Sequence, residues 1–371
     1  MNGLLIGDAA VELSKLPDGC VQTCVTSPPY WGLRDYGAAG QIGLEATPEE
    51  YVAKLVEVFR EVRRVLRDDG TLWLNLGDSY AANRGFQVPD SKHVDVGNSK
   101  GMKAESIGLK PKDLVGIPWR VAFALQADGW YLRQDIIWLK PNPMPESVTD
   151  RCTKAHEYIF LLSKSERYYY DAEAVKEPTL AQVPESQRES GAYSVGSGTT
   201  RNRRSVWTVP TKPFKGAHFA TFPPDLIEPC ILAGTSEAGC CSACGAPRER
   251  VVEKKATGRV QERQGGGLGT AVRREPLGLK PVAGTFQEGV VTRTVGWRPG
   301  CACGAGVVPC VVMDSFMGSG TTAMVAQELG RAWIGIEVNP AYEPLIRQRT
   351  AQAVLPMFAE AQGNLLVDGE E

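Results

Sequence analysis

Hydroxyl, proline and aromatic residues gather directly after an apolar segment, 21–25, near the start of the chain. The catalytic candidates among them are Ser27, Pro28, Pro29 and Tyr30. Ser27 and the Pro28 carbonyl offer hydrogen-bond acceptors, the prolines fix φ and hold those acceptors in place, and Tyr30 offers a flat face. Such a set suits a planar base that is held by its exocyclic amino group. Taken alone, the same run also fits a proline-stiffened turn.

A second candidate site follows the apolar segment 311–313. Its residues, in chain order, are Asp314, Phe316, Gly318, Gly320 and Thr321. The two glycines permit a tight turn and a close backbone approach, and the helix that follows would face a ligand with its N-terminus. The run is not a Walker A loop, because that loop needs a lysine directly after its last glycine. It also departs from the Gly-x-Gly-x-x-Gly spacing of dinucleotide-binding turns, although the Ala323 in place of the third glycine is an allowed variant.

Two carboxylates frame this turn and indicate its ligand. Asp314 could meet an ammonium group, and Glu337, at the end of the apolar segment 332–336, is a natural acceptor for ribose hydroxyls. A cofactor with a ribose and an ammonium group but no phosphate fits S-adenosylmethionine better than NAD or ATP. We therefore expect S-adenosylmethionine here, against the alternative of a glycine-rich turn with a purely structural role.

Helix-like and strand-like segments alternate around both sites. Thr47 as N-cap, Pro48 at the first helical position and Glu50 in a capping box predict the start of a helix that ends near 68–70. The rest of the pattern consists of a strand at 71–76, a helix at 118–128, strands at 135–138 and 156–162, and a strand-helix-strand unit at 311–337. This alternation predicts an α/β sheet.

The two candidate sites together make the chain resemble the amino-directed DNA methyltransferases, in the group whose catalytic motif precedes the cofactor motif. The family's (D/N/S)-P-P-(Y/F/W) matches 27–30, and its D-x-F-x-G-x-G-T matches 314–321. The resemblance continues through Gly7-Asp8, 135–142 and 215–223. It implies a Rossmann-like, S-adenosylmethionine-dependent methyltransferase sheet. It also implies further cofactor-binding residues, namely Asp8, Thr26, His218 and Phe219.

The reaction that the resemblance implies is methylation of an exocyclic amino nitrogen in double-stranded DNA. Ser27 and the Pro28 carbonyl would accept the amino hydrogens, and Tyr30 would stack on the flipped base. Carbon-5 methylation would need a cysteine on a Pro-Cys loop, but Cys230 and Cys310 both look structural. In the family a serine at the first motif position is more typical of cytosine-N4 enzymes than of adenine-N6 enzymes. We therefore expect cytosine N4, with adenine N6 as the alternative.

A cluster of cysteines indicates a metal site. Its members are Cys241 and Cys244, in C-x-x-C spacing, and Cys301 and Cys303, in C-x-C spacing. Four thiolates from two turns would make a closed, tetrahedral, structural zinc site. Free surface thiols are the alternative, and Cys240 is a competing ligand.

The resemblance covers most of the chain except the region of these cysteines. We expect a discontinuous catalytic domain, 1–235 and 305–371, and a Cys-rich insert, 236–304, that could form a zinc ribbon and contact DNA. Residues 248–274 hold eight Lys and Arg against three Glu, so this part of the insert could neutralise DNA phosphates or be a solvated loop. DNA-recognition elements are expected in 80–112 and 176–214, which are polar.

The bulk composition is that of an ordinary globular protein, with 43% hydrophobic and 23% charged residues. A net charge of −2 argues against a uniformly basic nucleic-acid coat, so DNA contacts must come from local patches. No apolar run suits a membrane span, and the start lacks a secretory signal, so we expect a cytoplasmic protein. A monomer and a dimer fit equally, and a cognate restriction endonuclease would be a separate chain. Weaker alternatives are an RNA or protein amino-methyltransferase and a non-enzymatic, zinc-bearing DNA-binding module.

Overall fold

The computed structural model describes residues 2–33, 35–38, 40–81, 108–178, 200–212, 221–256 and 290–351. Its contacts divide the chain into two compact units. The first comprises Met1–Ala174, Arg204–Glu249 and Arg298–Glu371, and the second comprises Val175–Arg203 and Arg250–Trp297. The four clustered cysteines therefore belong to the first unit, together with both candidate sites.

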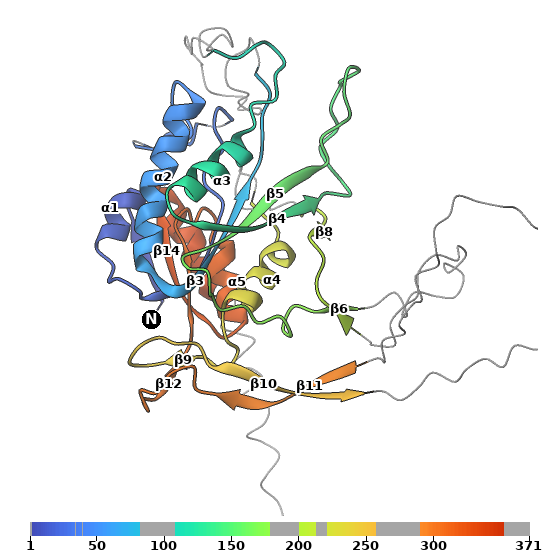
Figure 1. Ribbon diagram of the computed structural model, residues 1–371. Coiled ribbons are helices and arrows are strands. Elements are labelled where there is room, and N and C mark those ends of the chain that lie inside the picture. The colour runs from blue at the N-terminus through green and yellow to red at the C-terminus, as the bar shows by residue number, and fades with distance from the viewer. Residues whose placement is uncertain are drawn as a thin grey trace, which may run out of the picture. The chain divides into compact units, whose positions relative to one another are not determined.

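An eight-stranded sheet forms the centre of the first unit (Figure 1). Its strands, in spatial order, are β1 (Gly3–Ile6), β14 (Ala332–Glu337), β13 (Val311–Asp314), β2 (Val21–Thr26), β3 (Leu66–Leu76), β5 (His156–Ser163), β4 (Tyr131–Leu139) and β8 (Val206–Thr208). Neighbouring strands are parallel except at β5, which is antiparallel to both β3 and β4. The α/β prediction is confirmed.

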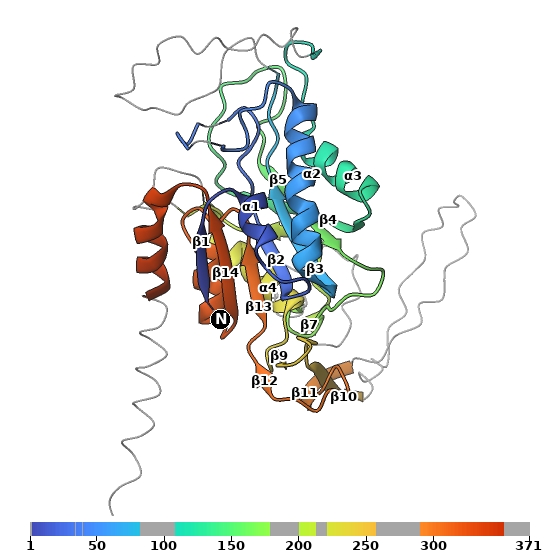
Figure 2. The same cartoon turned by 90° about the vertical axis from the view of Figure 1, so that its left-hand side faces the viewer.

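Helices cover both faces of this sheet (Figures 1 and 2). On one face lie α1 (Ala9–Ser14), α2 (Pro48–Val65) and α3 (Ile117–Ala127), and on the other lie α4 (Pro224–Gly234) and α5 (Thr321–Glu328). A parallel strand that is covered on both sides is buried along its whole length rather than at alternate residues. All residues of β2 and of β14 are accordingly buried. No helix in the described ranges is long and apolar enough to cross a membrane.

The remaining elements are short or paired in two-stranded sheets. The first unit also contains β9 (Cys240–Cys241), which pairs with β12 (Val307–Val308), and the 3-10 helix η4 (Pro340–Tyr342). The other two sheets pair β10 (Glu249–Ala256) with β11 (Val290–Arg298), and β6 (Glu177–Pro178) with β7 (Thr200–Arg201).

Helix α2 begins as its sequence predicts and ends earlier. The Thr47 side chain accepts the Glu50 amide at 3.1 Å, and the Glu50 carboxylate accepts the Ala46 amide at 3.1 Å. The helix ends at Val65, because Leu66 already belongs to β3. The end expected near 68–70 is therefore wrong. The strand extends from residue 66 through these polar residues.

Strands β2 and β13 mark the point where the direction of winding reverses. They are parallel neighbours, with Thr23 opposite Val312 and Cys24 opposite Met313. After β2 the chain continues to α2 on one face, and after β13 it continues to α5 on the other (Figure 1). The carboxyl ends of two such strands form the crevice in which α/β sheets bind ligands.

Candidate active site

A short hydrogen bond joins the two candidate loops at this crevice. Thr26 Oγ1, at the end of β2, donates to Asp314 Oδ1, at the end of β13, at 2.6 Å across 288 residues of sequence. Both side chains are buried. The loop that carries Ser27 and the glycine-rich turn therefore start side by side.

The Asp314 carboxylate is held by three donors from the protein. Besides Thr26, Thr322 Oγ1 donates to its Oδ2 at 2.6 Å and the Phe316 amide donates to its Oδ1 at 3.0 Å. Burial raises the pKa of Asp314, and these hydrogen bonds partly offset that rise. The carboxylate thus fixes the geometry of the turn. Its expected contact with a ligand ammonium group stays a prediction.

Glycine is required at the tight part of this turn. Gly318 and Gly320 have φ values of 54° and 81°, in the left-handed region that side chains disfavour. Gly320 is the N-cap of α5, and a Cβ atom there would lie 3.2 Å from Ile346. The turn therefore presents backbone rather than side chains in front of the helix N-terminus, an arrangement that suits a closely approaching ligand.

Glu337 connects the turn to the end of β14. Its carboxylate accepts the Gly318 amide at 2.8 Å and the Asn339 amide at 2.9 Å, and burial raises its pKa. A carboxylate has about four acceptor positions, so two remain for ligand hydroxyls. The Gly7 amide donates to the Glu337 carbonyl at 2.9 Å, which brings Asp8 to the same edge of the sheet. Asp8 itself caps helix α1.

The other expected cofactor residues have different positions. Phe316 packs edge-on against Phe59 of α2, with ring centroids 6.4 Å apart. Thr321 is buried in the first turn of α5. His218 and Phe219 lie outside the described residues.

Ser27 is oriented by Asn75, a residue near the end of β3. Ser27 Oγ donates to Asn75 Oδ1 at 3.3 Å, and Asn75 Nδ2 donates to the Tyr158 carbonyl at 3.0 Å. A carbonyl only accepts, so the Asn75 nitrogen must face Tyr158 and its oxygen must face Ser27. Because the Ser27 hydrogen is directed at Asn75, the lone pairs of its oxygen remain available to a substrate.

Tyr30 is fixed at both its hydroxyl and its ring. Its Oη lies 2.7 Å from Glu157 Oε2 and 3.1 Å from Asn75 Oδ1, and Glu157 in turn pairs with Lys140. A Cβ atom on Gly77 would lie 2.5 Å from the Tyr30 ring, so the ring packs directly against that backbone. Burial and the neighbouring Glu157 raise the pKa of the Tyr30 phenol, which therefore stays protonated.

Contacts from α2 and from the loop that precedes it hold the two prolines and Trp31. The Tyr51 hydroxyl donates to the Pro29 carbonyl at 2.8 Å, and Pro28 is buried. Trp31 is buried, and its Nε1 donates to the Glu45 carbonyl at 3.0 Å. The loop is thus preorganised rather than free. The role of the Pro28 carbonyl as second acceptor stays a prediction.

Sequence reasoning passed over four polar residues of the site: Asn75, Lys140, Glu157 and Thr322. Asn75 left a detectable signal, since it is the one amide in the apolar stretch 71–76, at the carboxyl end of a buried strand. Glu157 and Lys140 left none, because only the pairing of β4 with β5 brings them together.

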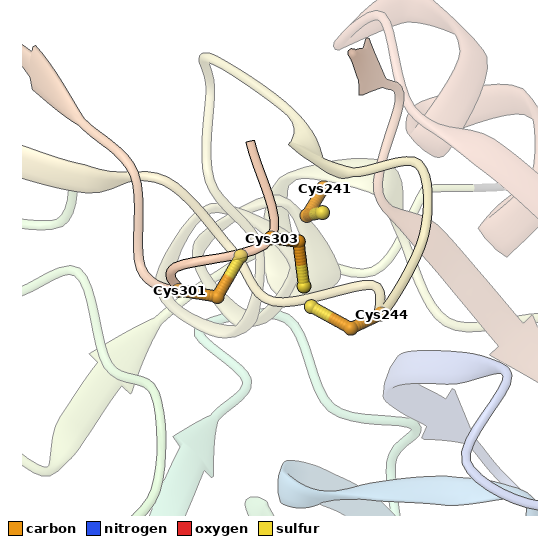
Figure 3. Close-up of side chains that lie close together, drawn as sticks. All are labelled: Cys241, Cys244, Cys301 and Cys303. Atoms are coloured by element: carbon orange, nitrogen blue, oxygen red, sulfur yellow. The ribbon is translucent and has the colours of Figure 1, made fainter. Parts of the chain in front are cut away.

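The sulfur atoms of the four clustered cysteines lie within 4.8 Å of one another (Figure 3). Cys240 lies outside this group, because it interacts with Cys310 and its sulfur is 3.7 Å from the Pro309 carbonyl. Cys230 is fully buried inside α4, and Cys310 is buried just before β13. The structural reading of both Pro-Cys pairs is therefore confirmed.

Comparison with known proteins shows that this chain is similar in sequence to DNA methylases. The DNA methylase family N6_N4_Mtase matches residues 21–241 and 310–348. The type II methyltransferase M.Cfr9I of Citrobacter freundii is 44% identical over 346 residues, which are 92% of this chain and 86% of that protein. M.SmaI of Serratia marcescens is 41% identical over 347 residues, which are 93% of this chain and 89% of that protein.

Solved structures show the same fold at lower identity. The PvuII DNA methyltransferase, described as cytosine-N4-specific, is 19% identical with a TM-score of 0.52, over 94% of this chain and 86% of that one. The Thermus thermophilus protein TTHA0409, in complex with S-adenosyl-L-methionine, is 21% identical with a TM-score of 0.50, over 95% of each chain. The resemblance seen in the motifs is confirmed, and the chain belongs to the N6/N4 family of DNA methylases.

Proposed function

We propose that the protein transfers a methyl group from S-adenosylmethionine to the N4 amino group of a cytosine flipped out of double-stranded DNA. The observation that carries this proposal is the hydrogen bond between Thr26 and Asp314. It aligns the loop of amino-group acceptors with the glycine-rich turn, so that the two reactants would meet at one edge of the sheet. Holding two reactants in line accounts for a large part of the acceleration of such a transfer.

The acceptor loop would overcome the weak nucleophilicity of the base. The lone pair of an exocyclic amino nitrogen is delocalised into the ring. Ser27 Oγ and the Pro28 carbonyl would accept the two amino hydrogens and favour a tetrahedral nitrogen whose lone pair can attack. The N–C bond forms as the S–C bond breaks, and the nitrogen then loses one proton to solvent or to an acceptor of the loop.

The cofactor would occupy the crevice beside the glycine-rich turn. S-adenosylmethionine supplies the methyl group as an electrophilic sulfonium. Glu337 would accept its ribose hydroxyls, and the backbone at Gly318 and Gly320 would lie against it. Asp8, Thr26, Asp314 and Phe316 would line the same crevice, with Thr321 holding the helix start and His218 and Phe219 completing the methionine side.

Two observations support cytosine N4 over adenine N6. A serine stands at the first position of the catalytic motif, and the PvuII enzyme, which shares the fold, is cytosine-N4-specific. Tyr30, tied to Glu157 and Asn75, would stack on the flipped base in either case.

The test uses the full chain, methyl-labelled S-adenosylmethionine and unmethylated double-stranded DNA, followed by digestion to nucleosides and mass analysis. The expected product is N4-methylcytosine, and Ser27→Ala should slow its formation severely while cofactor binding remains. Finding only 6-methyladenine would overturn the choice of base. Transfer of the labelled methyl group to RNA or protein, but not to DNA, would refute the proposal that DNA is the substrate.

DNA recognition is proposed for 80–112 and 176–214, within the catalytic domain formed by 1–235 and 305–371, and for the Cys-rich insert 236–304. Much of these segments lies outside the described residues. Because the relatives are named type II methyltransferases, we propose that a restriction endonuclease with the same recognition sequence accompanies this enzyme. Methylome sequencing of cells that express the chain would identify that sequence. Because its proposed substrate is cellular DNA, we propose that the protein is cytoplasmic, as its sequence leads us to expect.

A further inference from the structure

The cysteine cluster of the first unit has no role in methyl transfer, and its geometry suits a metal. The sulfur atoms of Cys241, Cys244, Cys301 and Cys303 lie within 4.8 Å of one another, and all four thiols are free. In a tetrahedral zinc-thiolate site with bonds near 2.3 Å, the sulfurs would be about 3.8 Å apart. A movement of about 1 Å at each side chain, within the reach of a χ1 adjustment, would close the site.

Both pairs of cysteines lie on tight turns that glycine completes. Gly245 follows Cys244 directly and Gly304 follows Cys303 directly, with φ values of 70° and 66°. Each turn can therefore reverse without strain after its second cysteine, which keeps the two thiols of a pair on one side. In the first turn the Gly245 amide donates to the Cys241 carbonyl at 2.8 Å.

The two turns also lie against each other. The Ser242 amide donates to the Gly306 carbonyl at 2.8 Å, and β9 pairs with β12 beside it. A Cβ atom on Gly300 would lie 2.2 Å from the Pro247 carbonyl, so the backbones touch next to Cys301. The cluster thus rests on backbone contacts of its own and not on the long intervening chain alone.

Core side chains anchor the first turn to the catalytic sheet. Arg67 of β3 donates to the Cys244 carbonyl, and Gln22 of β2 donates to the Gly245 carbonyl at 3.0 Å. The Gln22 side chain also accepts the Val311 amide at 2.6 Å, at the start of β13. The site is therefore joined to the strands that carry both functional loops, although at their opposite ends.

We propose that Cys241, Cys244, Cys301 and Cys303 bind one Zn²⁺ ion in a closed, structural site. Four thiolates leave no open position for a substrate, so the ion has no part in the chemistry of methyl transfer. Its proposed role is structural: the ion would hold together the two turns, 241–245 and 301–304, that flank residues 250–297 in the sequence. Iron also accepts four thiolates, and two disulfides are the oxidised alternative, so both are outcomes of the test.

The test measures metal content in the full chain, purified under reducing conditions from cells supplied with zinc. We expect one zinc per chain by elemental analysis, and release of that zinc when a mercurial reagent titrates the thiols. Replacement by Co²⁺ should give the thiolate charge-transfer and visible bands of a tetrahedral four-sulfur site. Cys301→Ser should reduce the zinc content to near zero, whereas Cys152→Ser, at an exposed thiol outside the cluster, should leave it unchanged.

A conservative variant separates loss of metal from loss of fold. Cys303→His keeps a zinc ligand and should retain most of the metal, with the circular dichroism spectrum of the parent protein. Removal of zinc by a chelator should increase protease cleavage near 245–256 and 290–300 without changing the nucleoside that is methylated. Four free thiols with no metal, iron in place of zinc, two disulfides by mass analysis, or full zinc in Cys301→Ser would each overturn the proposal.

Discussion

Asn75 gives the sharpest test of the proposed catalytic loop, residues 27–30. Its amide oxygen accepts the Ser27 hydroxyl at 3.3 Å and lies 3.1 Å from the Tyr30 hydroxyl. Asn75→Leu keeps the approximate shape of the side chain and removes every polar atom. The Ser27 hydrogen, without its acceptor, can then turn toward the substrate, where it opposes the amino hydrogens that Ser27 is proposed to accept.

The expected magnitude follows from the number of hydrogen bonds that are lost. The single hydrogen of the Tyr30 hydroxyl goes to Glu157 at 2.7 Å, so the bond that Asn75→Leu removes from the loop is the one from Ser27. A neutral hydrogen bond contributes about 1 kcal/mol, so the barrier should rise by about 1 kcal/mol and kcat should fall roughly fivefold. Affinity for S-adenosylmethionine should change by less than about twofold, because no hydrogen bond of Asn75 reaches the turn 314–321.

Single-turnover rates with saturating DNA and cofactor measure the effect, and calorimetry measures cofactor affinity. Thr71→Val is the matched control, since Thr71 is a buried polar residue of the same strand whose hydroxyl lies 2.9 Å from that of Thr23. It should cost a similar amount of stability and leave kcat nearly unchanged.

A double-mutant cycle tests whether Asn75 acts through Ser27. If it does, Asn75→Leu combined with Ser27→Ala should be about as slow as Ser27→Ala alone, because the hydroxyl that Asn75 orients is already gone. Fully additive losses would refute the positioning role, as would an Asn75→Leu variant with the kcat of the parent protein.

Three further substitutions test two residues of the proposed cofactor crevice and one half-buried amine beside Glu157. Gly320→Ala should weaken cofactor binding and lower the unfolding free energy by about 1–2 kcal/mol. The reason is that φ is 81° at this position and the new Cβ would lie 3.2 Å from Ile346. Unchanged cofactor affinity in calorimetry would contradict this prediction. Binding of S-adenosylmethionine should weaken as the pH falls through the raised pKa of Glu337, since the protonated carboxyl is a poorer acceptor. Glu337→Gln should flatten this dependence in calorimetric titrations that start at neutral pH and move downward, and a flat profile of the parent protein would refute the role. Burial lowers the pKa of Lys154, whose amine has no hydrogen-bond partner in the described ranges. The unfolded chain therefore binds this proton more tightly than the folded protein does. The free energy of unfolding should rise with pH until the pH reaches the pKa of the unfolded chain, near 10.4. Lys154→Met should flatten that rise and add roughly 0.5 kcal/mol at neutral pH in denaturant titrations, whereas a less stable variant would show that attraction from Asp78, Glu157 and Glu146 outweighs the cost of burial.

Residues that are close together in the sequence were the ones that could be interpreted without a structure. The Ser-Pro-Pro-Tyr run at 27–30 and the glycine-rich turn at 314–321 carry their meaning in consecutive side chains, because backbone geometry at a turn depends on local residue type. Helix α2 was predictable for the same reason, since its cap and its apolar spacing are local.

The end of α2 was not predictable from these local signals. Residues 66–70 are compatible with a last helical turn, but Leu66 already belongs to β3, where it lies opposite Val21 of β2. Sheet pairing is a non-local interaction, so it overrides a weak local preference.

The cysteine cluster shows the same division between local and non-local information. Spacing alone indicated two metal-binding turns, but it could not bring Cys241 and Cys301 together across the residues between them, and it left Cys240 as a competitor. Folding excludes Cys240, because β9 directs its side chain toward Cys310 instead.

The family, the reaction class and the position of both loops in the chain were therefore readable from 371 residues of sequence. Which side chains orient Ser27 and Tyr30 was not readable. Asn75, Glu157 and Lys140 come from three different strands of the sheet or their ends, and only strand pairing places them around the loop. A motif records what must be present next to the reacting atoms, whereas the residues that hold it in position are selected by packing between distant parts of the chain.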